Sequence, residues 1–379
     1  MRTLNICMLT NDFPPVCGGG GYHTLYLSLK LIKLGHKVTV ITRGTPGNTT
    51  YELYQGVPVY RARYLKLYPF QSQIFGLFAH RIFKKIEPDF DILVLNGPII
   101  PYFGTSIPTI IIEHVTARKF IDNLAPGSMF SIIFKLFSKF YINTDVNALK
   151  KAGKIVTVSK ACAEDIRTLY KLNDITTIPN GVDTSLFTPN IGATDTQDKI
   201  ILFVGIFGPI KGLFDLVQSA KYVTRSHPET RFVLAGKGPL EKDLKALVHD
   251  LGLQNYFEFV GYLQRDELIA KYQIATICVL PSWYEGMPTT LLEGMSCGIP
   301  IVATRVGGSS EVVIDGKTGL LVPKKNPELL AGAIVKLLDA PNLRNAMSVN
   351  ARNIAIESFD WNKIAQKFEN VMYSMLNNS

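Results

Sequence analysis

The stretch "KIILFVGIFGPIKGLFDLVQSA", residues 199–220, starts as a short apolar strand, passes through a loop and ends as a helix. The same order opens the chain, where "LNICMLT" at residues 4–10 is followed by a glycine run and a helix-like segment. Gly35 comes at the end of that segment, where a helix C-terminal glycine is expected. The restart at residue 199 therefore predicts two doubly wound α/β domains.

The remaining apolar runs repeat this alternation of strands and helices. They are continuous rather than interrupted at every second residue, as expected for parallel strands covered on both faces. In the first half we predict strands at residues 4–10, 36–42, 91–96, 109–114 and 154–159. In the second half we predict strands at residues 199–205, 231–238, 256–261, 276–282, 299–304 and 319–323. Ser159 is suited to be the N-cap of the helix that follows it.

Residues 176–199 join the two halves and are rich in Pro, Gly, Thr and Asp, the composition of a linker. We place an N-terminal Rossmann-like domain at residues 1–183 and a C-terminal Rossmann-like domain at residues 184–358. The amphipathic segment at residues 359–379 is predicted to form a final helix.

Composition excludes several classes of protein. The 379 residues are 47% hydrophobic and 19% charged, which is typical of a folded chain long enough for two domains. No apolar run approaches the ~18 residues that span a bilayer, and Asp12 and Pro14 interrupt the start too early for a signal peptide. Five dispersed cysteines without C-x-x-C spacing favour reduced thiols over disulfides or a zinc site. We expect a cytoplasmic protein.

The net charge is unevenly distributed. Residues 1–183 contain 21 Lys and Arg against 12 Asp and Glu, whereas residues 184–379 contain 19 of each. The basic half indicates an anionic partner such as a phosphate-bearing substrate, anionic lipid or nucleic acid, or simply an excess of surface lysine.

In open α/β sheets, ligands bind beyond the carboxyl ends of the strands. After the first strand come four glycines, residues 18–21, which permit close approach of a phosphate or form a flexible loop. Lys211 follows the strand at residues 199–205 and precedes a helix, so it is either a phosphate ligand or an ordinary solvated lysine.

The stretch "WYEGMPTTLLEGMSCGIP", residues 283–300, follows another strand. Pro288 fits the first turn of a helix, and Cys297-Gly298 ends that helix after about three turns. Glu285 lies before the helix and Glu293 lies on its second turn, so two carboxylates bracket the free N–H groups of the helix start. Such donors suit a diphosphate, and carboxylates suit the hydroxyls of a ribose or hexose. The alternative is that Glu285 caps the helix and Glu293 is a surface residue.

Several of these stretches resemble the family 4 glycosyltransferases. "EGMPTTLLE" is similar to the E-x7-E motif of that family, "VGIFGPIKG" to its lysine-bearing loop, and "IPNGVDTSLFTP" to its interdomain segment. The glycine run and the helix after it resemble the start of the same proteins. The resemblance extends over nearly the whole chain and implies the GT-B architecture. In this fold two Rossmann-like domains face a cleft, and the last helix crosses back to the first domain.

The resemblance implies a role for each matching residue. Glu293 would bind the ribose of a nucleotide-sugar donor, and Glu285 would contact and orient the donor sugar. His114 matches a family histidine beside the reacting sugar carbon, so the implied catalytic residues are His114, Glu285 and Lys211. The implied donor-binding residues are Gly19, Gly20, Lys211, Glu285, Gly286, Met287, Thr289, Thr290 and Glu293.

One position departs from the family pattern. The family usually has Arg directly after the glycine of "FVG", and this chain has Ile206. Each charge-assisted bond to a diphosphate contributes on the order of 1.5–3 kcal/mol. Either another cation, such as Arg305 or one from the basic half, replaces that arginine, or the leaving group is stabilised less.

The family resemblance implies a retaining transferase that needs no metal or other cofactor. Lys211 and the helix N-terminus would stabilise the departing diphosphate while an acceptor hydroxyl attacks from the same face. Alternatives are a non-transferase GT-B enzyme such as a nucleotide-sugar epimerase, a nicotinamide-dependent oxidoreductase, and a non-catalytic sugar-binding protein. The lack of a clear G-x-G-x-x-G followed by an acid disfavours the oxidoreductase. No nucleic-acid-binding motif is present.

The first domain is expected to bind the acceptor, a glycan, lipid or small molecule. Residues 60–86 and 117–141 combine aromatic and basic side chains. Within the second segment, Phe130, Ile133, Phe134, Phe137 and Phe140 have helical spacing, with Lys135 and Lys139 expected on other faces. Either this helix packs in the core or it contacts anionic lipid. The basic charge favours a place at the inner face of the plasma membrane.

Overall fold

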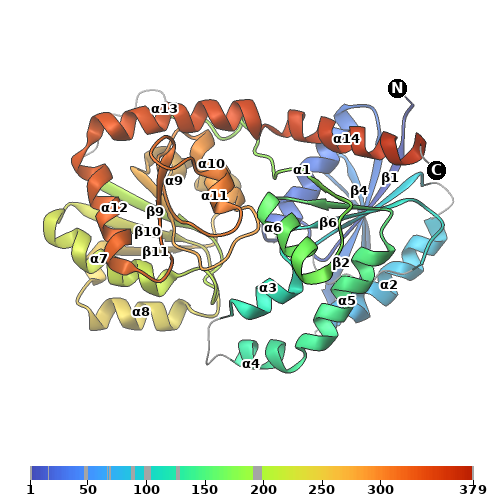
Figure 1. The fold of residues 1–379 in the computed structure, drawn as a ribbon, viewed down its shortest axis with the longest axis horizontal. Coiled ribbons are helices and arrows are strands. Elements are labelled where there is room, and N and C mark those ends of the chain that lie inside the picture. Colours follow the sequence, from blue (N-terminus) through green and yellow to red (C-terminus); the bar gives the residue numbers. More distant parts are fainter. Residues whose placement is uncertain are drawn as a thin grey trace. The chain divides into compact units, whose positions relative to one another are not determined.

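The computed structural model describes residues 2–15, 17–46, 50–65, 67, 70–86, 90–97, 104–124, 129–190 and 199–377 (Figure 1). The chain divides into two compact units. Unit 1 comprises Met1–Asn180 and Trp361–Ser379, and unit 2 comprises Gly181–Asp360. Each unit has a largely parallel sheet with helices on both faces, which confirms the predicted fold class.

The sheet of unit 1 has eight strands in the order β3-β4-β2-β1-β5-β6-β7-β8. All neighbouring strands are parallel except the antiparallel pair β3 and β4. Its strands are β1 (Asn5–Thr10), β2 (Lys37–Pro46), β3 (Thr50–Tyr54), β4 (Val57–Tyr64), β5 (Ile92–Asn96), β6 (Thr109–Glu113), β7 (Lys154–Thr157) and β8 (Ile175–Thr177).

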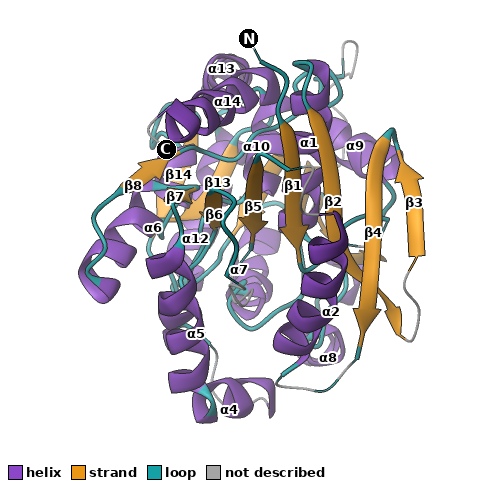
Figure 2. Ribbon diagram, turned by 90° about the vertical axis from the view of Figure 1, so that its right-hand side faces the viewer, coloured by secondary structure: helices purple, strands orange, loops and turns teal. Residues whose placement is uncertain are grey.

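Helices cover both faces of this sheet. The core on one face is formed by α2, α5 and α6 against the strands, and Figure 2 shows α2 and α5 on that side. On the other face α1 lies beside α14 (Figure 1). The helices of unit 1 are α1 (Gly19–Lys33), α2 (Gln71–Ile86), α3 (Ala117–Asp122), α4 (Met129–Leu136), α5 (Ser138–Lys151), α6 (Lys160–Asp165), the π-helical turn Ile166–Tyr170 and α14 (Trp361–Asn377).

The last helix, α14, packs on the first helix of the chain. The Trp361 ring contacts the rings of His23 and Tyr26, with centroids 5.1 and 6.0 Å apart. His36 accepts a hydrogen bond from the Leu4 N–H through Nδ1, and its Nε2 lies 3.0 Å from Glu369 Oε1. The end of the chain therefore belongs to unit 1.

The sheet of unit 2 has six parallel strands in the order β11-β10-β9-β12-β13-β14. Its strands are β9 (Lys199–Val204), β10 (Thr230–Ala235), β11 (Phe257–Gly261), β12 (Ile277–Leu280), β13 (Ile301–Thr304) and β14 (Gly319–Val322). Its helices are α7 (Leu213–Ser226), α8 (Glu241–Asp250), the 3-10 turn Gln254–Tyr256, α9 (Arg265–Ile274), α10 (Thr289–Ser296), α11 (Ser309–Val312), α12 (Pro327–Asp339) and α13 (Pro341–Ser358).

Helix ends follow the sequence signals closely. Gly35 has a φ of +94° just after α1, and Gly298 has a φ of +71° just after α10, both in the left-handed region that favours glycine. The Ser159 hydroxyl accepts a hydrogen bond from the Cys162 N–H and caps α6, as predicted. The hairpin of β3 and β4 was missed, although its turn at Gln55-Gly56 carries a glycine signal.

The structure changes the interpretation of the aromatic segment around α4. Phe134 is buried and stacks on Tyr141, with ring centroids 4.7 Å apart, so this side faces the core. The opposite side is an exposed stripe of apolar and basic residues, which we call the α4 stripe. It consists of Ile132, Lys135 and Leu136 on α4 together with Lys139 and Phe140 at the start of α5. Both lysines lie on another face than the buried Phe134, as expected, whereas Phe140 is exposed with them.

Candidate functional site

Three loops of unit 2 meet beyond the carboxyl ends of adjacent strands. They follow β9, β12 and β13, which are neighbours in the sheet. The Trp283 N–H donates to the Ile210 carbonyl (2.7 Å), and the Gly308 N–H donates to the Glu285 carbonyl (3.1 Å). The loop after β12 is thus held between the other two loops.

Glycines make these close backbone contacts feasible. A Cβ on Gly212 would lie 1.9 Å from the Pro281 carbonyl oxygen, and one on Gly308 would lie 1.8 Å from the Gly286 carbonyl oxygen. A Cβ on Gly307 would likewise lie 2.0 Å from the Glu285 carbonyl oxygen. Any side chain at these positions would push the loops apart.

The structure brings Lys211 and Glu285 together. Lys211 Nζ lies 2.6 Å from Glu285 Oε1, which also accepts a hydrogen bond from the buried Ser282 hydroxyl at 2.6 Å. Glu285 is almost fully buried, and a buried carboxylate needs a partner of opposite charge. The ammonium of Lys211 is that partner. This pairing rules out the alternative that Glu285 caps α10, since α10 has no side-chain cap. Sequence reasoning missed Ser282.

Helix α10 starts one residue later than predicted. Pro288 has extended backbone angles and occupies the N-cap position, so Thr289 and Thr290 are the first two helical residues. The first N–H groups of a helix have no partner within the helix, and they carry its partial positive charge. Gly286 and Met287 lie in the buried loop that leads into this helix.

Glu293 lies on α10 and is half-buried rather than a free surface charge. Its Oε2 accepts a hydrogen bond from the Tyr272 hydroxyl of α9 at 2.9 Å, and that hydroxyl also lies 3.0 Å from the Thr290 carbonyl. Burial raises the pKa of Glu293 to about 7, against the opposing charge of Arg265. Tyr272 escaped sequence reasoning because a tyrosine in a helix carries no distinctive signal.

The predicted residues of unit 1 lie around one buried amide. Gly19 and Gly20 begin α1, and the Gly20 carbonyl accepts a hydrogen bond from the Asn96 side-chain amide at 3.2 Å. The same amide donates to Thr24 Oγ1 at 2.6 Å, and its nitrogen lies 3.1 Å from His23 Nδ1. Asn96, the last residue of β5, thus connects the glycine loop to the end of β5.

His114 follows β6 and contacts the other end of the same amide. Its Nε2 lies 2.7 Å from Asn96 Oδ1. Because that oxygen only accepts, Nε2 carries the ring proton and Nδ1 carries the lone pair. Burial lowers the pKa of His114 to about 4, so the ring is neutral at physiological pH. Nothing in the sequence marked Asn96 as the residue that fixes this tautomer.

The position where the family pattern has arginine offers no cation. Ile206 is exposed at the loop after β9. Arg305, named above as a substitute, forms an ion pair with Asp315 in which the nitrogen and oxygen lie 2.5 Å apart. Arg305 is therefore engaged elsewhere in unit 2.

Two family models match consecutive parts of the chain. The model described as Glycosyltransferase Family 4 matches residues 17–186, and that of the glycosyl transferases group 1 matches residues 187–354. An uncharacterized glycosyltransferase of Methanocaldococcus jannaschii is 27% identical over 394 residues, with 97% of each chain covered. The chain belongs to the family 4 glycosyltransferases, and its activity is the transfer of a sugar.

Solved structures show the same fold. Sucrose-phosphate synthase from Thermosynechococcus elongatus has a TM-score of 0.85 at 21% identity, with 100% of both chains covered. Anabaena HepE in complex with UDP and glucose has a TM-score of 0.77 at 17% identity, covering 98% of this chain and 100% of that one. The predicted GT-B fold is thereby confirmed.

The contact between the Gly308 and Gly286 backbones predicts a sensitive position. In Gly308→Ala the new methyl group must displace the loop that carries Glu285, at a cost of about 1–3 kcal/mol in unfolding free energy. Sugar transfer should fall as well. The matched control is Gly332→Ala, which meets nothing within 4 Å on an exposed face of α12 and should be neutral or slightly stabilising. Equal stability of the two variants in thermal unfolding would contradict the packing argument.

The raised pKa of Glu293 predicts a pH-dependent stability. Above pH 4.5 the unfolded chain gains by ionising Glu293, whereas the folded chain ionises it only near pH 7. Stability is therefore lost between these values, by roughly 2–3 kcal/mol. Glu293→Gln should remove this loss, so its stability relative to wild type should rise from pH 5 to pH 8. Glu357→Gln on the exposed face of α13 is the control and should parallel wild type.

Proposed function

We propose that the protein is a retaining hexosyltransferase that uses a nucleotide-diphosphate sugar as donor. Unit 2 binds the donor: Glu293 holds the ribose hydroxyls, and Glu285 holds the sugar beside Gly286 and Met287. Lys211 and the N–H groups of Thr289 and Thr290 hold the diphosphate. The observation that carries this proposal is the Lys211–Glu285 pair, held by three packed loops next to a helix start.

The chemistry of these groups matches the parts of such a donor. Carboxylates accept hydrogen bonds from vicinal hydroxyls, whereas an ammonium and helix N–H groups donate to phosphate oxygens. The Lys211 ammonium retains further N–H groups beyond the one directed at Glu285. Family membership favours this use of the site over an oxidoreductase or a sugar-binding protein.

Unit 1 contributes Gly19, Gly20 and His114 to the same reaction. The bond between C1 of the sugar and the phosphate oxygen breaks, while the acceptor hydroxyl oxygen bonds to C1 from the same face. The acceptor's proton passes to the departing phosphate oxygen. A neutral His114 adds no positive charge beside the oxocarbenium-like carbon. The proposed reaction requires no metal or other cofactor.

We propose a lipid-linked or glycan acceptor in cell-envelope or polysaccharide synthesis, reached from the cytoplasmic face of the membrane. None of the helices in the described ranges is long and apolar enough to cross a bilayer. Contact would instead be peripheral, through the α4 stripe. Leu136 is 75% exposed there, flanked by two exposed lysines. Apolar side chains inserted between cations are suited to the surface of anionic lipid.

The donor assignment predicts selective nucleotide binding. Calorimetry and thermal shift with UDP, GDP, ADP and NAD should show a preference for one nucleoside diphosphate, lost in Glu293→Ala because the ribose hydroxyls lose their acceptor. Affinity should rise with pH toward about 7, where Glu293 ionises.

Two outcomes would count against this assignment. Binding of NAD with no response to any nucleoside diphosphate would refute the transferase mechanism. Conversion of a nucleotide sugar to its epimer without acceptor-dependent release of the nucleoside diphosphate would favour the epimerase instead.

The α4 stripe predicts binding to anionic vesicles. Sedimentation with phosphatidylcholine vesicles containing phosphatidylglycerol should retain wild type, and pure phosphatidylcholine should retain little. Lys135→Ala with Lys139→Ala should weaken binding by about thirtyfold, at about 1 kcal/mol per lysine. The control Val349→Ser removes an apolar side chain that is 61% exposed on α13 and should bind like wild type. Two results would overturn the membrane proposal. One is wild-type vesicle binding by the double variant, and the other is a dimer in solution that dissociates when the stripe residues are substituted.

A further inference from the structure

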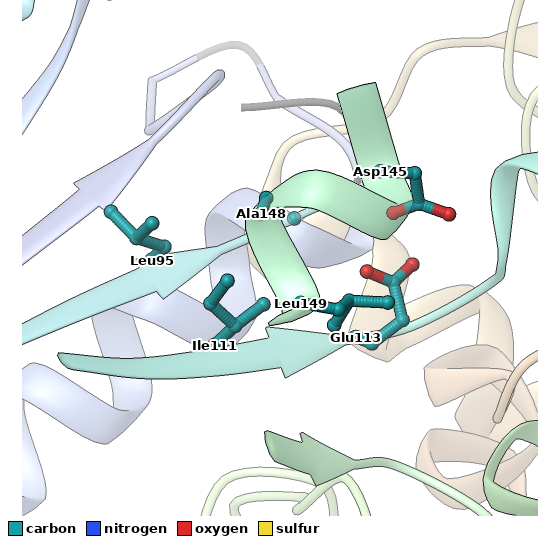
Figure 3. A pocket seen from close by; sticks show the side chains of 7 residues that line it. Leu95, Ile111, Glu113, Asp145, Ala148 and Leu149 are labelled. Carbon is teal, nitrogen blue, oxygen red and sulfur yellow. The ribbon is translucent and has the colours of Figure 1, made fainter. Parts of the chain in front are cut away.

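Two buried carboxyl groups lie beneath the His114 loop and have no part in the mechanism above. Glu113 is the last residue of β6 and is 1% exposed, and Asp145 on α5 is 2% exposed. Figure 3 shows their carboxyl groups turned toward each other beside a small cavity. Glu113 Oε1 has no hydrogen-bond partner among the described residues. A buried carboxyl pair of this kind requires a physical explanation.

Asp145 holds the start of helix α3. Its Oδ2 accepts hydrogen bonds from the Ala117 N–H at 2.9 Å and from the Tyr170 hydroxyl at 2.7 Å. The Tyr170 oxygen in turn accepts from the Arg118 N–H at 3.2 Å. The Thr116 hydroxyl accepts from the next N–H along the helix. The first three N–H groups of α3 are thus all bound by side chains.

These contacts fix the short loop that carries His114. The loop runs from Glu113 at the end of β6 to Ala117 at the start of α3, so His114 lies between two points attached to the pair. An ionised Asp145 is favoured at a helix start, because the helix dipole and the N–H groups stabilise its negative charge. The loop geometry therefore depends on Asp145 remaining an acceptor.

The second carboxyl group must be neutral for this arrangement to persist. Burial and the nearby charge of Asp145 raise the pKa of Glu113 well above its usual value. Burial also raises the pKa of Asp145, but the Ala117 N–H, the Tyr170 hydroxyl and the Glu113 side chain oppose that rise, so the proton belongs on Glu113.

Within the described part of the chain, the titratable groups that act on the pair are Tyr170 and the Cys162 thiol, and neither is basic. The ion pair of Lys119 with Asp165, whose nitrogen and oxygen lie 3.3 Å apart, lies beside Cys162 and balances its own charge.

We propose that Glu113 and Asp145 share one proton and act as positioning residues for His114. Asp145 fixes the start of α3, and the protonated Glu113 holds Asp145 in place by donating a hydrogen bond to it. Loss of the shared proton would place two negative charges side by side in the core and loosen the loop. This inference rests on the proposed role of His114 only in its consequence for catalysis.

The first test needs no substrate. Above pH 4.5 the unfolded chain gains by ionising Glu113 while the folded chain retains the proton, so wild type loses stability as pH rises. Glu113→Gln keeps a donor toward Asp145 and cannot ionise. Its melting temperature relative to wild type should rise by roughly 2–4 °C between pH 5 and pH 9. The control Glu164→Gln makes the same change at an exposed site and should follow wild type. A constant difference for Glu113→Gln would overturn the shared proton.

The second test reads the position of His114 directly. In NMR spectra of protein with carbon-13-labelled histidine, the His114 ring resonance is identified as the one that is absent from His114→Gln. In wild type this resonance should shift when the pH is raised to alkaline values. It should remain constant in Glu113→Gln. Identical behaviour of the two proteins would overturn the link between the pair and the loop, whatever the enzyme's substrate.

Kinetics then separates positioning from binding. Tyr170→Phe removes the hydroxyl between Asp145 and the Arg118 N–H and should lower kcat about tenfold, with the donor KM changed less than about twofold. Tyr51→Phe on β3 is the control and should keep the wild-type kcat. The kcat of wild type should fall at alkaline pH, where the carboxyl pair loses its proton, and this fall should move to higher pH in Glu113→Gln. A wild-type kcat in Tyr170→Phe would overturn the positioning role. A wild-type kcat in His114→Gln would instead refute the proposed role of His114 and leave the first two tests standing.

Discussion

The site in unit 2 depends on direct contact between the backbones of neighbouring loops. The carbonyl oxygens of Pro281, Glu285 and Gly286 lie where glycine is the only residue that fits opposite them. This contact brings the loop after β12 close enough to Lys211 for its ammonium to pair with a buried glutamate. Without the ammonium, the charge of Glu285 would be buried without compensation, at a cost of several kcal/mol.

In unit 1 the loops are positioned by side chains rather than by contact between backbones. Its loops are held by side chains that reach across from other elements: Asn96 to the glycine loop and His114, and Asp145 and Tyr170 to the start of α3. Polar side chains allow a wider spacing than backbone contact does, but each of them must be fully satisfied in the core. The loop positions of unit 1 are therefore sensitive to the protonation of the side chains that hold them, whereas those of unit 2 are sensitive to side-chain volume at its glycines.

The sequence alone predicted the fold class and placed Lys211 and Glu285 in loops at the ligand-binding edge of one sheet, for a simple reason. Both residues directly follow apolar strands, and parallel strands deliver such residues to one edge of the sheet. Asn96, Asp145 and Tyr272 were missed because their partners are 18 or more residues away and they belong to no local pattern. Helical spacing also grouped Phe140 with the buried Phe134 although Phe140 is exposed, since spacing identifies a stripe but not which of its members meet the core.

The return of α14 to unit 1 has a consequence for the order of folding. Unit 2 is one continuous segment, whereas unit 1 is completed only by residues at the end of the chain. During synthesis, unit 2 emerges whole before Trp361 and Glu369 are available to cover His23 and His36. The domain that begins the sequence is thus the last to be finished, reversing the usual progression from N-terminus to C-terminus. A chain arrested near its end would present a complete second unit beside an unfinished first one.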